Sequence, residues 1–155
     1  MNLQELLDND QLEKINISLE DIKNRRDKAY RIFNFAVKNL SGSGHGDEDI
    51  IYSNLYDSIR MSCEVLLWLS GYRVKKSSEG HHYITINAAG ELLSGEMKNE
   101  FQRIQKMRQK RNRFDYGNLS SISEAELSQA LFDAKALFSK IGSLIESEER
   151  QQKIL

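Results

Sequence analysis

The sequence predicts an all-α protein, arranged as an antiparallel four-helix bundle with additional short helices. The first observation is that none of the 155 residues is a proline, although about 5% of residues in an average protein are. Proline breaks helices, so this chain can form long uninterrupted ones. The second is that four segments repeat their apolar residues at about 100° per residue, as amphipathic helices do. Short connections between such helices favour an antiparallel bundle.

The composition indicates one globular domain. A chain of 155 residues can bury one core but is too short for two ordinary domains. With 39% hydrophobic and 29% charged residues, it resembles neither a disordered chain nor a membrane protein. We expect a short helix or extension over residues 1–17, a single helical domain over 18–150 and a frayed tail over 151–155.

The N-terminal half contains two predicted long helices. Residues 19–40 form the first, with Ser18 as its N-cap, and a short helix is expected before it over 3–12. A Gly- and Ser-rich loop follows. The second helix covers 49–70 and ends at Gly71, a residue suited to a helix C-terminus.

The segment after Gly71 is predicted to be a polar loop over residues 72–80, followed by a short helix over 84–93. The sequence Ile84-Thr85-Ile86 would also suit a strand, but no partner strand is evident, so a helix is favoured. The last helix follows a Ser123-x-x-Glu126 capping box and runs to Ile145.

The third long helix, from Glu96, changes character along one face. Met97, Phe101 and Ile104 are apolar, but continuing the same face leads to the polar residues Arg108, Arg111, Asn112 and Asp115. An arginine facing another helix needs a partner, and Asp115 is the nearest candidate for Arg111. This pattern fits either a structural ion-pair cluster or a functional anion site, and both alternatives stay open.

The basic charge is concentrated in this helix. The chain carries a net charge of −1, but the seven cations between residues 98 and 113, less Glu100, give this segment +6 and leave −7 elsewhere. The sequence lacks the common nucleotide, zinc and acyl-transfer motifs, so we expect no metal site and no cofactor. His81 and His82 are adjacent, and adjacent side chains on a helix diverge, which makes them a poor metal pair.

The cellular setting is inferred from what the sequence lacks. The single cysteine, Cys63, lies in an apolar run and is expected to be a buried thiol in a reducing compartment. The N-terminus has no basic signal-peptide region, and no apolar run approaches the roughly 18 residues of a membrane span. We therefore expect a cytoplasmic protein with no membrane contact.

At these residues the chain resembles the HEPN family of small helical bundles. The resemblance covers roughly residues 49–145. It includes Gly71-Tyr72-Arg73 after the leucine-rich helix, then Gly80-His81-His82, then the pair Arg111-Asn112.

The resemblance implies a homodimer with its functional motif at the dimer cleft. Many HEPN proteins are metal-independent ribonucleases, commonly toxins paired with a nucleotidyltransferase-like antitoxin. Their motif is an Arg, often followed by Asn, and then a His after four to six residues, and in this chain Tyr116 stands in the place of that His. By this resemblance the catalytic candidates are Arg111, Asn112 and Tyr116, and the nucleic-acid-binding candidates are Arg108, Lys110, Arg111, Arg113, His81 and His82.

The histidine-to-tyrosine change favours binding over cleavage. Metal-free RNA cleavage needs a base near neutral pH, which His, with a pKa near 6.5, supplies better than Tyr, with a pKa near 10. The sequence therefore predicts a homodimer that binds RNA or a nucleotide, and leaves open whether it is a toxin-type ribonuclease with a variant motif. The alternative is a noncatalytic protein-interaction module, in which the same polar cluster forms a structural dimer interface.

Overall fold

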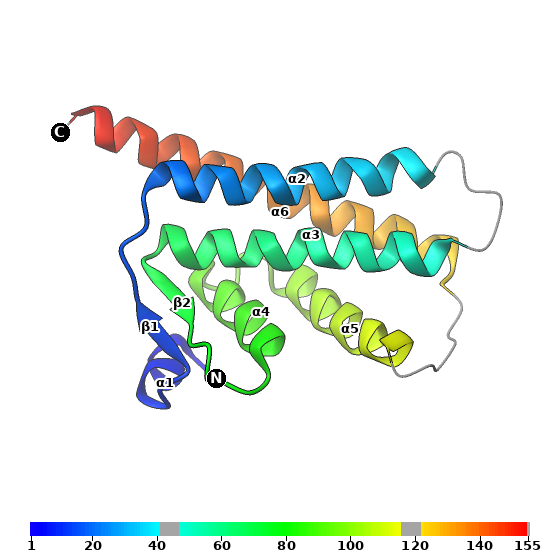
Figure 1. The fold of residues 1–155 in the computed structure, drawn as a ribbon, viewed down its shortest axis with the longest axis horizontal. Helices are drawn as coiled ribbons and strands as arrows, with labels where there is room; N and C mark the ends of the chain where they lie inside the picture. Colours follow the sequence, from blue (N-terminus) through cyan, green and yellow to red (C-terminus); the bar gives the residue numbers. More distant parts are fainter. Residues whose placement is uncertain (41–46, 116–121, 155) are drawn as a thin grey trace.

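Helices dominate the computed structural model, which describes residues 1–40, 47–115 and 122–154 (Figure 1). The all-α prediction is therefore confirmed. The helices are α1 (Leu3–Asp8), α2 (Leu19–Leu40), α3 (Glu48–Leu69), α4 (His81–Leu92), α5 (Lys98–Asp115) and α6 (Glu124–Ile154), and the strands are β1 (Leu12–Lys14) and β2 (Tyr72–Val74).

The central element is α3, which packs against α2, α4, α5 and α6. In Figure 1, α2 runs antiparallel beside α3, α6 lies behind both, and α4 and α5 lie below. Leu55, Ile59 and Cys63 on α3 are all fully buried, as expected of a helix surrounded by others. Burial raises the pKa of the Cys63 thiol, which keeps it protonated.

Local signals in the sequence set the helix ends. The α2 helix has the predicted bounds, and the amide of Asp21 donates to Ser18 Oγ at 3.1 Å. At the start of α6 the amide of Glu126 donates to Ser123 Oγ at 3.1 Å, and the Glu126 carboxylate accepts from the Ser123 amide at 3.4 Å. Gly71, with a φ of 83°, takes the left-handed conformation that follows many helices.

Two of the predictions are wrong because the chain forms a small sheet. The helix predicted over 3–12 ends at Asp8, and the loop predicted over 72–80 begins with a strand. Strands β1 and β2 pair antiparallel, with Leu12 opposite Val74, and both of these side chains are buried. The pairing joins segments about 60 residues apart, so neither strand has a local signal that reveals its partner. The same contacts make the N-terminal segment part of the core, since Leu6 is also fully buried.

The last helix is longer than expected. It continues to Ile154, so residues 151–154 are helical where a frayed tail was predicted. An ion pair between Lys23 on α2 and Glu149 contributes to fixing this end of α6. Among the residues that the structure describes, no helix has the length and apolar character needed to cross a membrane.

An ion pair between a partly exposed arginine and a buried carboxylate joins α5 to α6. The Asp133 side chain is 1% exposed, and Arg103 donates to its two carboxylate oxygens, from Nη2 at 2.8 Å and from Nε at 2.9 Å. Gln129 adds a third donor at 3.3 Å. A buried carboxylate requires such partners because burial removes its hydration.

Replacing Arg103 should therefore destabilise the fold. We expect Arg103→Met to lower the free energy of unfolding by about 2 to 4 kcal/mol, because Asp133 stays buried without its main donor. Urea titration measures this change. Arg31→Met, which removes an exposed arginine on α2, should change stability by less than about 0.5 kcal/mol; equal effects of the two substitutions would contradict the assignment.

Candidate anion-binding site

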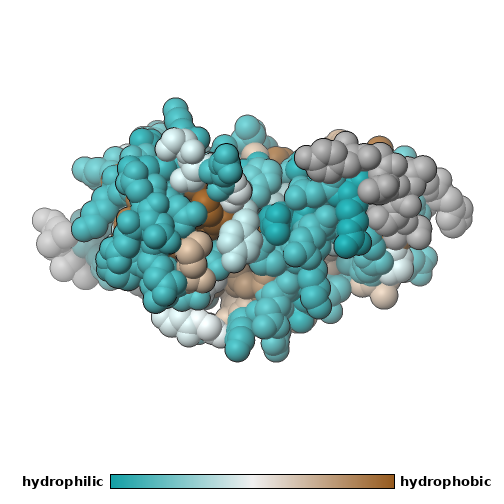
Figure 2. Space-filling model, turned by 90° about the horizontal axis from the view of Figure 1, so that it is seen from below, coloured by the Kyte–Doolittle hydropathy of each residue, from teal (hydrophilic) through white to brown (hydrophobic). Residues whose placement is uncertain are grey.

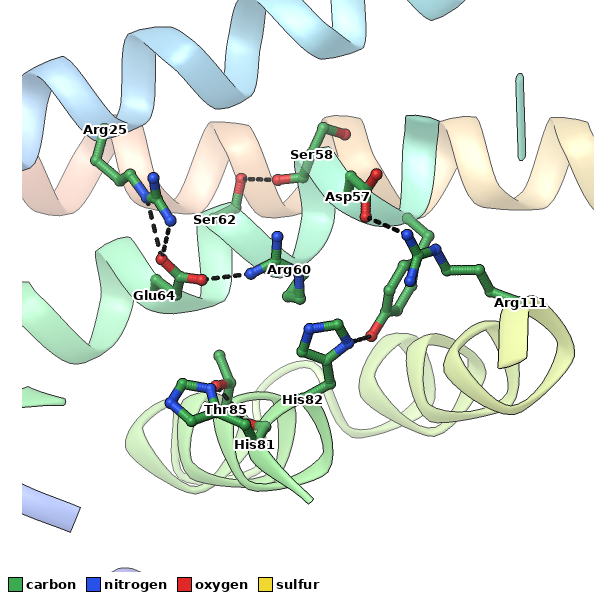
Figure 3. A network of polar contacts seen from close by, with 11 residues as sticks. Arg25, Asp57, Ser58, Arg60, Ser62, Glu64, His81, His82, Thr85 and Arg111 are labelled. Atoms are coloured by element: carbon green, nitrogen blue, oxygen red, sulfur yellow. Dashed lines mark hydrogen bonds and ion pairs between the residues drawn. The ribbon is translucent and has the colours of Figure 1, made fainter. Parts of the chain in front are cut away.

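Three helices bring one cluster of polar side chains together, which we call the Arg111–His82 site. It comprises Tyr56, Asp57 and Arg60 from α3, His82 from α4 and Arg111 from α5. Asp57 and Arg60 lie three residues apart and so share one side of α3, facing α4 and α5 (Figure 3). The site therefore depends on how α4 and α5 pack against α3.

Arg111 makes two contacts with α3. Its Nη2 lies 3.4 Å from Asp57 Oδ1, and its Cζ lies 5.4 Å from the centre of the Tyr56 ring. The ion pair that the structure gives is with Asp57, which comes within reach because α5 packs against α3. The side chain of Asp115, the partner expected from the sequence, lies outside the described residues, so that pairing stays a prediction.

The Arg111–Asp57 pair is not deeply buried. The Arg111 side chain is 23% exposed and that of Asp57 is 30% exposed. A partly exposed ion pair at 3.4 Å is weaker than a buried pair with two short bonds. Arg111 can therefore exchange part of this contact for an anion from solvent.

Tyr56 links Arg111 to His82. Its ring is fully buried beneath the Arg111 guanidinium, and its hydroxyl lies 3.4 Å from His82 Nδ1. Burial raises the pKa of Tyr56 to about 12, although the nearby arginines act against this shift. The hydroxyl thus keeps its proton at neutral pH and can donate it to His82 Nδ1, in which case Nε2 carries the imidazole hydrogen.

His82 is held in its neutral form. Burial lowers its pKa from the ordinary 6.5, and the positive charges of Arg60 and Arg111 lower it further, while Asp57 opposes the shift. A neutral imidazole can act as a hydrogen-bond donor to an anion and can also take up a proton when an anion binds.

Arg60 adds a second guanidinium to the site. Its Nη1 donates to Glu64 one turn along α3, and the other oxygen of that carboxylate accepts from Arg25 Nε at 3.0 Å (Figure 3). One glutamate is thus shared by two guanidiniums. Arg60 and Arg111 thus place two guanidiniums beside His82, with Asp57 paired to Arg111 and Glu64 to Arg60.

The other predicted residues on α5 are dispersed. Arg108 lies over the Tyr83 ring at 5.5 Å and contributes to the positive potential around Tyr56. Lys110 is paired with Glu126 of α6, Asn112 is half-buried and Arg113 is exposed. The structure thus assigns Lys110 an interhelical ion pair and leaves Arg113 at the surface.

His81 is not part of the cluster. His81 points away from His82 and lies on the other side of Arg60 (Figure 3). Tyr116 lies outside the described residues.

Sequence reasoning missed the three α3 residues of the site. A signal was present, because Asp57, Arg60 and Glu64 recur at spacings of three and four in a helix whose other positions are mostly apolar. Such a stripe marks a polar face on an otherwise buried helix. Its partners on α4 and α5 could not be identified from this spacing alone.

The surface around the site suits a polar ligand. The face on the α4 and α5 side, seen from below, is mainly hydrophilic, with only a limited apolar area near its middle (Figure 2). Within the described residues, no three His, Cys, Asp or Glu side chains are grouped so that they could hold a metal ion. Comparisons with family models, with curated proteins and with solved structures find no match to this chain.

The lowered pKa of His82 predicts how stability depends on pH. The unfolded chain binds a proton at His82 more readily than the folded chain does, so stability should fall as the pH drops below about 6.5. We expect His82→Gln to reduce this loss of melting temperature between about pH 7.5 and pH 5.5, measured by circular dichroism. His81→Gln is the matched control and should keep the pH dependence of the melting temperature that is due to His82. If the melting temperature of His82→Gln depends on pH in the same way as that of the unmodified protein, the lowered pKa of His82 is contradicted.

Proposed function

We propose that this chain is a HEPN-like helical-bundle protein that binds RNA or a nucleotide through a phosphate group at the Arg111–His82 site. The observation that carries the proposal is that the guanidiniums of Arg60 and Arg111 lie beside His82 where α3, α4 and α5 meet, with Asp57 paired to Arg111. These are the residue types that bind phosphate best, since guanidinium groups offer a planar pair of donors and imidazole adds a titratable one.

Each residue has a distinct part in the proposed binding. The Arg111 guanidinium stays over the buried Tyr56 ring and donates to the phosphate in place of its contact with Asp57. His82 donates from Nε2 while its Nδ1 accepts from Tyr56. Arg60 is held by Glu64 and supplies positive charge without leaving its position.

Binding is better supported than cleavage. If Tyr56 donates to Nδ1 of His82, then Nε2 already carries a hydrogen and cannot accept one from a ribose hydroxyl. A ribonuclease would need the opposite tautomer, or a base at position 116, where this chain has tyrosine. The proposal therefore has phosphate binding as its main part and ribonuclease activity as a further, separately tested part.

The alternative is a noncatalytic interaction module. The observation that favours it is the Arg111–Asp57 ion pair, which could serve only to hold α5 against α3. The homodimer and a nucleotidyltransferase-like antitoxin as a partner enter the proposal through the family resemblance alone.

Arg111→Ala should separate the two functions. If Arg111 binds phosphate, the variant should bind a labelled single-stranded RNA at least tenfold more weakly. The slope of log affinity against log salt concentration should also be less steep by about 0.7, because one phosphate contact is lost. Its stability should fall by only about 1 kcal/mol, because the ion pair that it loses is partly exposed. Fluorescence anisotropy and urea titration measure the two effects.

Two further variants complete this test. Arg111→Lys keeps the charge but not the planar fork, so it should bind RNA with intermediate affinity. Arg31→Ala removes an exposed arginine on α2 and should leave RNA affinity nearly unchanged. A loss of about 3 to 5 kcal/mol in stability for Arg111→Ala with unchanged RNA affinity would favour the structural module.

Tyr116→His tests the chemical step. The added imidazole can take the proton of a ribose 2′-hydroxyl, whose oxygen then attacks phosphorus while the 5′ oxygen leaves. We expect the variant to cleave RNA in the presence of a chelator, giving a 2′,3′-cyclic phosphate and a 5′-hydroxyl end, both detectable by mass spectrometry. A variant that folds and binds RNA but produces neither end would remove the ribonuclease part of the proposal.

A further inference from the structure

A second polar groove lies on the other side of Arg60. It has a volume of about 310 Å³ and is bounded by residues from α2, α3, β2 and α4. Its polar and aromatic lining consists of Arg25, Glu64, Trp68, Arg73, Lys76 and His81. Figure 3 shows that His81 points toward this side of α4 whereas His82 points toward Arg111. The two adjacent histidines thus belong to two different sites.

Cations exceed carboxylates in this groove. Among the described residues that line it, Glu64 is the only carboxylate, and it is shared by Arg25 and Arg60. Arg73 is paired with Glu13 across the small sheet at 2.5 Å, but it is exposed and stays at the groove's edge. Lys76 is also exposed and forms no ion pair with any residue that the structure describes. This excess of positive charge suits a phosphate.

Trp68 gives the groove a flat apolar surface. The Arg25 guanidinium lies over the indole, with Cζ 5.7 Å from the ring centre, and both side chains line the groove. Aromatic rings and stacked arginines are the surfaces on which unpaired nucleic-acid bases stack. The groove therefore combines a stacking surface with positive charge, which are the two features that single-stranded nucleic acid requires.

A continuous chain of ion pairs joins the groove to the Arg111–His82 site. Glu64 accepts from Arg25 on the groove side and from Arg60 on the site side. Arg60 in turn contributes to the positive potential at His82. The guanidiniums of Arg25 and Arg60 thus lie on either side of Glu64, between the groove and the Arg111–His82 site.

We propose that this groove, which we call the Trp68 groove, is a second subsite for the same single-stranded RNA. One base stacks on the Arg25 guanidinium that lies over Trp68, and a neighbouring phosphate is neutralised by Lys76 and Arg73. The inference rests on the proposed phosphate binding at the Arg111–His82 site and adds the ligand class: an oligonucleotide that spans both subsites, rather than a mononucleotide.

Trp68 itself reports on the groove, since it is the only tryptophan in the chain. The full chain is titrated with AMP and with single-stranded RNA of about 2 to 10 nucleotides. We expect Trp68 fluorescence to be quenched once the RNA is long enough to reach both subsites, with affinity rising at the same length. AMP at the same concentration should quench it far less, because a single nucleotide cannot occupy both subsites at once.

Variants then separate stacking from charge. Trp68→Leu should weaken binding of the longest RNA by about fivefold or more, measured by anisotropy, and Trp68→Phe should restore most of the affinity because it keeps an aromatic ring. Lys76→Ala should make the slope of log RNA affinity against log salt concentration less steep by about 0.7, because it removes one phosphate contact. Lys135→Ala, which removes an exposed lysine on α6, should change neither quantity. Melting curves confirm that each variant is folded.

The outcomes distinguish the two proposals. If the unmodified protein binds no RNA of any length, the proposed function fails and the Trp68 groove fails with it. If RNA binds and Arg111→Ala weakens it, but Trp68→Leu and Lys76→Ala do not, only the second subsite is wrong. Quenching by AMP equal to that by the longest RNA would also overturn it, because one nucleotide would then fill the groove.

Discussion

The burial of α3 among four other helices is the constraint on which the rest of the structure depends. Because α3 has neighbours on several sides, a charged residue that packing buries on it must find a partner or lose hydration without compensation. Asp57 meets Arg111 of α5, and Glu64 meets Arg25 of α2. These ion pairs connect the central helix to its neighbours at defined positions.

The same constraint produces the unusual electrostatics around His82. Two guanidiniums, from Arg60 and Arg111, lie close enough to lower its pKa, and burial acts in the same direction. Burial keeps the Tyr56 hydroxyl protonated, so Tyr56 is a neutral side chain between Arg111 and His82. A cluster that is positive, partly open and supported from below by a buried ring is organised for an anion before any anion is bound.

The basic helix α5 shows how the fold divides one charged segment into different roles. Arg103 neutralises the buried Asp133, and Lys110 is paired with Glu126, so both charges serve the contact with α6. Arg108 and Arg111 instead stack on tyrosines of α4 and α3. The net charge of this segment therefore overstates the number of cations that a ligand can contact, since some of these cations are paired with carboxylates of the protein itself.

The sequence by itself determined most of the helices, their caps and the change from apolar to polar residues along α5. Those features depend on the helical period and on hydrogen bonds between close neighbours, such as Ser18 with Asp21 and Ser123 with Glu126. It also singled out Arg111 and His82, but it could not say that they share a site or which of the two histidines joins it. Only the tertiary structure decided that His82 and not His81 contacts Tyr56, that Asp57 pairs with Arg111, and that β1 pairs with β2. These contacts join residues far apart in the chain, and their geometry is set by how α4, α5 and the N-terminal segment pack around α3, which no local periodicity encodes.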